Sequence, residues 1–405
     1  MRITFLCRSS ILLLIFCIFL FNGICWSESD TRAGRIEIKP SFSLTETYDD
    51  NIYLLEENEV DSYITVVSPG ISLSVPLKKH LFKIGYGAEA FYYSEESEIN
   101  DATHQKLSSL IDLDFPVGLS FKFKGDYLDT TAQPYSELIE RVKYRNADLQ
   151  AIVGYEFSRK LSFQINQLYR SYDYYESVYY ENLLNRRENE SALTIFYRFL
   201  RKTSFLAGYD VGQIKYEYED SLNDSKYTQA WIGAKGKIAP KTEAILRIGQ
   251  QSREYTERED EDRDFSGSMV RIGSLTDFSP RTSLEVTLLR QIAESIYADN
   301  LYYTSTRGEL KLSQRIAKKW NLVLGGLYEQ NAYPEESTED DVTQKRTDDI
   351  IGADIDLRYH IHKWLSWGIR SQFKKRDSNF DAYDYEVNRF SGDVIDYMLE
   401  IRLVF

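Results

Sequence analysis

Every second position along the last eleven residues of the chain is apolar, and the positions between are mostly polar or charged. A period of two predicts a β-strand with one apolar face and one polar face. The apolar series consists of Ile395, Tyr397, Leu399, Ile401, Leu403 and Phe405. The positions between them include Asp396, Glu400 and Arg402, so the opposite face of this strand carries charge.

The same alternation recurs in residues 107–115, 119–126, 193–199, 351–361 and 365–372. In a soluble sandwich such strands would need a very large core, and their long edges would aggregate. In a closed membrane barrel the apolar face meets lipid and no edge remains. The pattern therefore predicts a transmembrane antiparallel β-barrel, an all-β fold whose polar face lines the interior.

Short turn sequences recur about every 40 residues and set the number of strands. They lie at residues 76–80, 116–118, 158–160, 200–202, 239–241, 279–281, 317–319 and 362–364. Longer polar segments separate them, such as 95–103, 256–264 and 333–348. Eight tight turns and nine longer loops predict about 18 strands, an even number as in single-chain bacterial barrels. A β-propeller also repeats every ~40–45 residues, but these segments are too long for four strands per repeat.

The amino-terminal segment has the organisation of a secretory signal peptide. Arg2 and Arg8 flank the start of an apolar run from Ile11 to Phe21, which is too short to span a bilayer. We expect residues 1–27 to be removed near Ser27 and residues 28–405 to form the barrel. The alternative is lipid attachment at Cys25, although Ile24 is larger than the residue usual before a lipidated cysteine. All three cysteines lie in this segment, so the mature chain can form no disulfide.

Charge is distributed unevenly along the chain. The net charge of −14 becomes −16 when Arg2 and Arg8 leave with the signal, which argues against a nucleic-acid partner. The tight turns are basic, and the longer loops are mostly acidic. Basic turns suit phospholipid headgroups, and acidic loops suit lipopolysaccharide through bridging cations. Alternatively, the same gradient biases which charged solutes enter the barrel.

Two regions resemble known outer-membrane proteins. The final strand, which stops on an aromatic residue, resembles the closing strand of bacterial outer-membrane barrels. The resemblance implies that the barrel-assembly machinery reads Tyr397, Leu399, Ile401, Leu403 and Phe405. The segment from Phe42 to Ile52, followed by Ser68-Pro-Gly-Ile-Ser-Leu73, resembles the outer-membrane β-barrel porin family. Some members of that family are associated with exopolysaccharide biosynthesis and export, which implies polysaccharide-export proteins as partners.

Charged residues on the polar face are the candidate pore lining. These residues are Asp112, Asp114, Lys122, Lys124, Asp126, Arg198, Asp354, Asp356, Arg358, Arg370, Glu400 and Arg402. A mixture of signs is typical of water-filled channels and sets a transverse field. The alternative is that these charges pair with one another and only keep the interior wet. No cofactor is expected.

Two groups of residues could bind a metal. Asp49, Asp50 and Asn51 offer oxygen ligands for Ca²⁺, but such a run more often caps its own loop. His360 and His362, two residues apart, are predicted to place two imidazoles on one face of a strand. Their position beside tryptophans at a turn favours a role at the membrane interface over a metal site.

Aromatic clusters and one histidine complete the candidates. Tyr172, Tyr174, Tyr175, Tyr179 and Tyr180 could stack on sugar rings, but their place near strand ends favours an aromatic girdle at the membrane surface. His104 is the one histidine suited to catalysis near the longer loops, and no nucleophile motif surrounds it. We therefore expect a channel for hydrophilic solutes or a secreted polysaccharide. The alternatives are a non-conducting structural or adhesive barrel and an outer-membrane enzyme.

Overall fold

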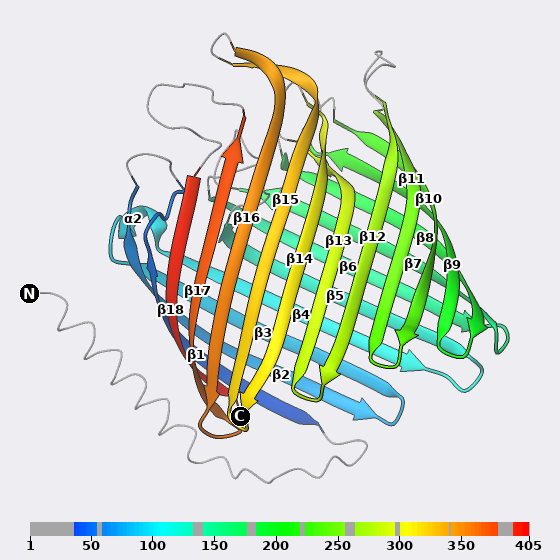
Figure 1. Cartoon of the computed structure of the whole chain (residues 1–405), viewed down its shortest axis with the longest axis horizontal. Helices are drawn as coiled ribbons and strands as arrows, with labels where there is room; N and C mark the ends of the chain where they lie inside the picture. Colours follow the sequence, from blue (N-terminus) through cyan, green and yellow to red (C-terminus); the bar gives the residue numbers. More distant parts are fainter. Residues whose placement is uncertain are drawn as a thin grey trace, which may run out of the picture.

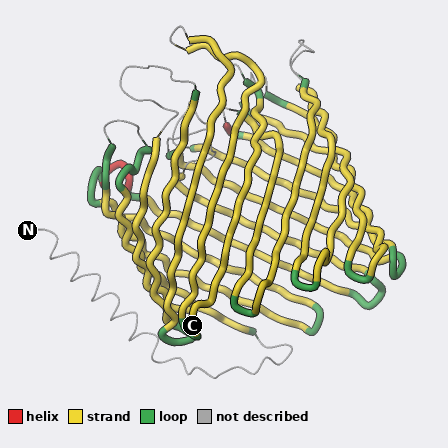
Figure 2. The backbone as a smooth tube through the Cα atoms, viewed as in Figure 1, coloured by secondary structure: helices red, strands yellow, loops and turns green. Residues whose placement is uncertain are grey.

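A single closed sheet makes up the molecule. The computed structural model describes residues 36–54, 59–132, 141–175, 184–218, 223–255, 264–295, 300–339, 342–379 and 392–404. Within these residues, 18 antiparallel strands pair each with its neighbour in sequence, and the first strand also pairs with the last (Figures 1 and 2). The predicted barrel is confirmed. The signal segment and Phe405 lie outside the described residues.

The strands are long enough to cross a bilayer with residues to spare. Their bounds are β1 Glu37–Asp49, β2 Ser62–Leu77, β3 His80–Tyr93, β4 Ala102–Asp114, β5 Leu119–Ala132, β6 Val142–Glu156, β7 Leu161–Tyr174, β8 Arg186–Leu200, β9 Thr203–Tyr216, β10 Ser225–Ala239, β11 Thr242–Tyr255, β12 Phe265–Ser279, β13 Thr282–Glu294, β14 Tyr302–Ala317, β15 Trp320–Glu339, β16 Val342–His360, β17 Leu365–Ser378 and β18 Gly392–Val404. The shortest have 13 residues, more than the ~9–11 that a tilted membrane strand needs.

The two ends of the barrel differ. All eight predicted tight turns are found at one end, here called the turn end, where β1 begins and β18 stops (Figure 1). The opposite end, here called the loop end, carries the other connections and the short helix α2 (Ser97–Asn100). In bacterial outer-membrane barrels the short turns are periplasmic and the longer loops extracellular. No helix among the described residues is long and apolar enough to cross a membrane.

The pairing register places apolar residues opposite apolar residues, and polar opposite polar, from strand to strand. Residues directly opposite each other in a ladder share a face of the sheet. Ile401 of β18 lies opposite Leu44 of β1 and Trp367 of β17, whereas the next residue, Arg402, lies opposite Ser43 and Ser366. The apolar face is solvent-exposed in the isolated chain, with Ile401 at 43%. This exposure is expected of a surface that lipid covers.

One predicted loop is a paired extension of the wall. The polar segment 333–348 was expected to be a loop, but β15 runs to Glu339 and β16 starts at Val342, with Glu336 opposite Lys345. This hairpin rises above the rest of the loop end (Figure 1). The alternation of apolar and polar residues disappears there because both faces of the hairpin are outside the bilayer. The sequence pattern therefore predicts a loop, although backbone pairing continues.

The wall is split near the loop end between β12 and β13. Their ladder stops at Val270 and Arg290, although both strands continue and stay paired with their other neighbours. Side chains bridge the split. Arg253 on β11 forms an ion pair with Glu294 on β13. The ring of Phe265 packs edge-on against the ring of Tyr302, with ring centroids 4.8 Å apart.

Candidate pore lining

Contacts between strands that are not neighbours show which face of the sheet is the inner one. The Arg358 guanidinium on β16 binds Glu400 on β18, across β17, and Arg141, just before β6, donates to Tyr93 on β3. Side chains meet across intervening strands only on the concave side. The register carries the face of Arg358 and Tyr93 through the polar positions of the ladders. The polar face is therefore the inner face.

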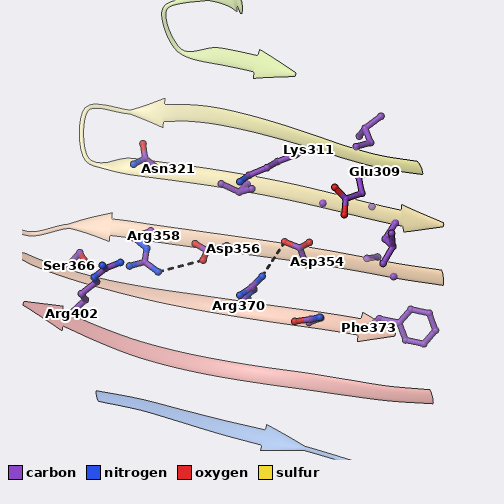
Figure 3. Close-up of a pocket in the computed structure, with 18 of the residues that line it drawn as sticks. Glu309, Lys311, Asn321, Asp354, Asp356, Arg358, Ser366, Arg370, Phe373 and Arg402 are labelled. Atoms are coloured by element: carbon purple, nitrogen blue, oxygen red, sulfur yellow. Dashed lines mark ion pairs between the residues drawn. The ribbon is translucent and has the colours of Figure 1, made fainter. Parts of the chain in front are cut away.

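All twelve candidate pore-lining residues lie on this inner face according to the register. The largest group surrounds a hollow of about 770 Å³ in the wall formed by β14 to β18 (Figure 3). There the Arg358 guanidinium lies 3.6 Å from Asp356 and also binds Glu400, while Arg370 lies 3.9 Å from Asp354. Arg402 lines the same hollow and has no ion pair among the described residues.

A second group lies on β4 and β5. Lys122 pairs with Asp112 at 2.8 Å, and Asp114 lies 3.9 Å from Lys79 of the neighbouring turn. Lys124 and Asp126 make no ion pair with any described residue.

Arg198, on β8 near the turn end, donates to the carbonyl of Arg159 at 3.2 Å. Eight of the twelve candidates therefore lie in ion pairs. Lys124, Asp126, Arg198 and Arg402 form none with a described residue.

A buried ionic network near the loop end was not among the predicted sites. Asp348 accepts hydrogen bonds from Arg346 at 2.9 and 2.7 Å, from Arg376 at 2.7 Å and from the Ser378 hydroxyl at 2.7 Å. Asp348 is fully buried, and the Arg346 guanidinium also lies over the ring of Tyr333. The sequence pattern placed Asp348 in a predicted loop, so it showed neither the face that Asp348 occupies nor the two arginines that converge on it.

The expected aromatic girdle is wrong for two of its tyrosines. Tyr172 and Tyr174 lie on the inner face, where Tyr174 is fully buried against Tyr144 with ring centroids 5.2 Å apart. The Arg186 guanidinium lies 4.2 Å from the centre of the Tyr172 ring. Tyr175 alone lies on the outer face, where its hydroxyl donates to Asp129 at 2.8 Å. Tyr179 and Tyr180 lie outside the described residues.

Large rings lie flat on the inner wall of β9 to β11 because glycines stand opposite them. Trp231 is the cross-strand partner of Gly208, and Tyr227 is the partner of Gly212. A Cβ at Gly208 would lie 2.1 Å from the Trp231 ring, so no larger residue fits there without moving the ring. The alternation of β9 and β10 could have revealed the shared face. The matching of small and large residues depends on register, which sequence alone does not give.

The metal hypotheses are not supported by the arrangement of their residues. Asp49 accepts the backbone N–H of Asn51 at 2.9 Å, which is the loop-capping alternative. Asn51 in turn donates to the carbonyl of Asp393, and no group of three or more potential ligands occurs among the described residues. His360 lies 3.0 Å from the Asn321 amide. His362 belongs to the following turn and stacks on Trp364, so the two imidazoles are not on one strand.

His104 lies against Phe91 on the inner wall, with ring centroids 4.4 Å apart. Its Nε2 is buried without a hydrogen-bond partner. No activated nucleophile adjoins the imidazole in the part of the chain that the structure describes. Among the described residues, His104 therefore forms no nucleophile–base contact of the kind that serine hydrolases use.

The inner charges and the closed wall agree with the comparison against protein families. Residues 29–395 match the family described as Putative beta-barrel porin 2. The chain belongs to this family. It is a porin-like barrel of the bacterial outer membrane, and no curated protein sequence matches it.

Solved structures of outer-membrane barrels resemble this porin-like chain at low identity. OccK2 (OpdF) of Pseudomonas aeruginosa is 9% identical with a TM-score of 0.49, and the alignment covers 91% of this chain and 98% of that one. OccAB3 of Acinetobacter baumannii is 11% identical with a TM-score of 0.46, covering 91% and 100%. The siderophore receptor PirA of Pseudomonas aeruginosa is 11% identical with a TM-score of 0.45, covering 93% and 82%.

Proposed function

We propose that the barrel is a passive channel through which hydrophilic solutes cross the outer membrane. The observation that carries this proposal is the separation of the two faces, charged within and apolar outside. Barrels of 16–18 strands are wide enough to hold water. Solutes would then cross by diffusion along a charged wall, and the connections at the loop end would govern access.

The test is the insertion of the purified chain into planar lipid bilayers. A channel gives stepwise increases in current, with conductance rising with salt concentration. A structural or adhesive barrel gives none, and its loops would bind a partner instead. An enzyme would lose activity on replacement of His104 and would need no conductance. Absence of current from a chain that still shows the β-sheet circular dichroism of a folded barrel would overturn the proposal.

A secreted polysaccharide is a second candidate cargo. The observation in its favour is that Tyr172, which is only partly buried, lies on the inner face, where an aromatic ring can meet a sugar ring. Polysaccharide-export proteins would then be partners and would supply the driving force. Block of the bilayer current by soluble oligosaccharides, with relief in Tyr172→Ser, would support this cargo, and unchanged current would exclude it.

We also propose how the chain reaches its site. Tyr397, Leu399, Ile401 and Leu403 share the outer face of β18, available to the barrel-assembly machinery, and Phe405 lies outside the described residues. Removal of residues 1–27 near Ser27 would precede assembly, and the mass of the purified protein tests this cleavage. Outer-membrane lipid and lipopolysaccharide are the proposed surroundings.

A further inference from the structure

Two arginines face each other on the inner wall. Arg247 of β11 is the direct cross-strand partner of Arg271 of β12. Like charges directly opposite each other in a ladder are destabilising. Leu246 and Ile272, the neighbouring residues on the outer face, are exposed apolar side chains, so the pair lies within the membrane-spanning part of the wall.

No described carboxylate forms an ion pair with either arginine. Several other inner arginines do have a carboxylate partner, as in Arg186 with Glu188, Arg253 with Glu294 and Arg346 with Asp348. Arg247 and Arg271 make no ion pair with any residue that the structure describes. The Nε of Arg247 is buried without a hydrogen-bond partner, whereas Arg271 is exposed to the interior.

The surrounding wall holds Arg247 in place through an aromatic ring and not through an ion pair. Its guanidinium lies 4.4 Å from the centre of the Trp231 ring. Trp231 is itself fixed, because its indole N–H donates to Asp210 at 3.0 Å. On the other neighbouring strand of each arginine, Gly233 of β10 lies opposite Arg247 and Leu289 of β13 lies opposite Arg271. Neither offers an acceptor side chain.

We propose that Arg247 and Arg271 form an anion-binding site for the carboxylate or phosphate group of a passing solute. Planar guanidinium groups bind both kinds of oxyanion through paired N–H donors. An anion between the two arginines would offset their repulsion and occupy donors that the wall leaves open. This inference rests on the proposed channel function, because a solute must reach the interior of the barrel to bind there.

The test is titration of inorganic phosphate into the full chain in detergent, followed by calorimetry at constant ionic strength. We expect wild type to bind phosphate, and Arg271→Gln to bind at least about tenfold more weakly, since one of two charged donors is lost. The matched control is Arg198→Gln. It removes the same charge from the inner face near the turn end, and phosphate binding should stay at the wild-type level.

A second measurement separates binding from folding. Arg271→Gln should unfold at the same temperature as wild type or higher, because one of two facing like charges is gone. A lower unfolding temperature would contradict the argument, as would equal phosphate binding in Arg271→Gln and Arg198→Gln. Conductance without phosphate binding in wild type would overturn the site and keep the channel. Phosphate binding without conductance would overturn the channel and keep the site.

Discussion

At the scale of single residues, the inner wall is organised by carboxylates that hold several donors at once. Asp348 binds two arginines and a hydroxyl, and all of its contacts are buried or partly buried. Removing one member of a buried ion pair leaves an uncompensated charge in the wall, which costs far more than the loss of a surface pair.

Replacing Asp348 should therefore destabilise the barrel strongly. We expect Asp348→Ala to lower the free energy of unfolding by about 3–5 kcal/mol, because Arg346 and Arg376 would lose their shared carboxylate. Urea unfolding in lipid vesicles, followed by tryptophan fluorescence, measures the change. The control is Asp377→Ala, whose carboxylate pairs with Lys375 at 3.2 Å on the exposed outer face. Comparable losses in the two variants would contradict the role assigned to Asp348.

The face of the sheet on which a residue lies could be predicted from sequence, but the side chains that it contacts could not. The polar positions of β4, β5, β16, β17 and β18 follow from alternation alone, because the period of a strand is two. Lys79 and Asp114 meet because a turn lies next to a strand end, and Tyr172 meets Arg186 because of register. Such contacts join residues far apart in the chain, which local patterns do not encode.

At the scale of elements, the seam between β1 and β18 is fastened at the loop end by side chains of the first loop. Asp50 accepts the backbone N–H of Ile395 at 2.7 Å, and the Asn51 amide donates to the carbonyl of Asp393 at 2.7 Å. Asn51 is almost fully buried, at 1% exposure. These bonds hold the residues after β1 against the start of β18.

Removing both side chains should loosen the seam. We expect the double variant Asp50→Ala and Asn51→Ala to be less stable, since each buried group left without its partner costs about 1–3 kcal/mol. The measurement is the temperature at which the folded band converts to the unfolded band in unboiled detergent gels. Glu95→Ala removes an exposed carboxylate from the same end of the barrel and should convert at the wild-type temperature. Identical conversion of all three proteins would show that the seam does not depend on these bonds.

Element boundaries were predictable where the bilayer fixes them. The eight tight turns follow from their spacing, because each pair of strands must cross the membrane and return. The β15–β16 hairpin was missed because its upper part no longer alternates. Pairing there depends on backbone hydrogen bonds between Glu336 and Lys345 and their neighbours, which any polar sequence can form.

At the scale of the whole molecule, stability depends on the outer face meeting lipid. We expect Ile401→Arg to lower the free energy of unfolding in lipid by about 2–4 kcal/mol, as for a cation placed near the bilayer midplane. Arg402→Ile should change it far less, because Arg402 makes no ion pair with a described residue. Unfolding titrations in vesicles compare the two. Equal tolerance at the adjacent positions would reverse the assignment of inside and outside.

The pairing of β1 with β18 governs the order in which the protein can be made. Residues 44 and 401 become neighbours only after the whole polypeptide has left the ribosome and crossed the inner membrane. Until then, both edges of a growing, half-built wall expose unpaired backbone groups to other chains. A chain in this state can pair with its own copies. A truncation that removes residues 392–404 would delete the partner that the first strand needs, and so would leave an open edge however much of the wall had formed.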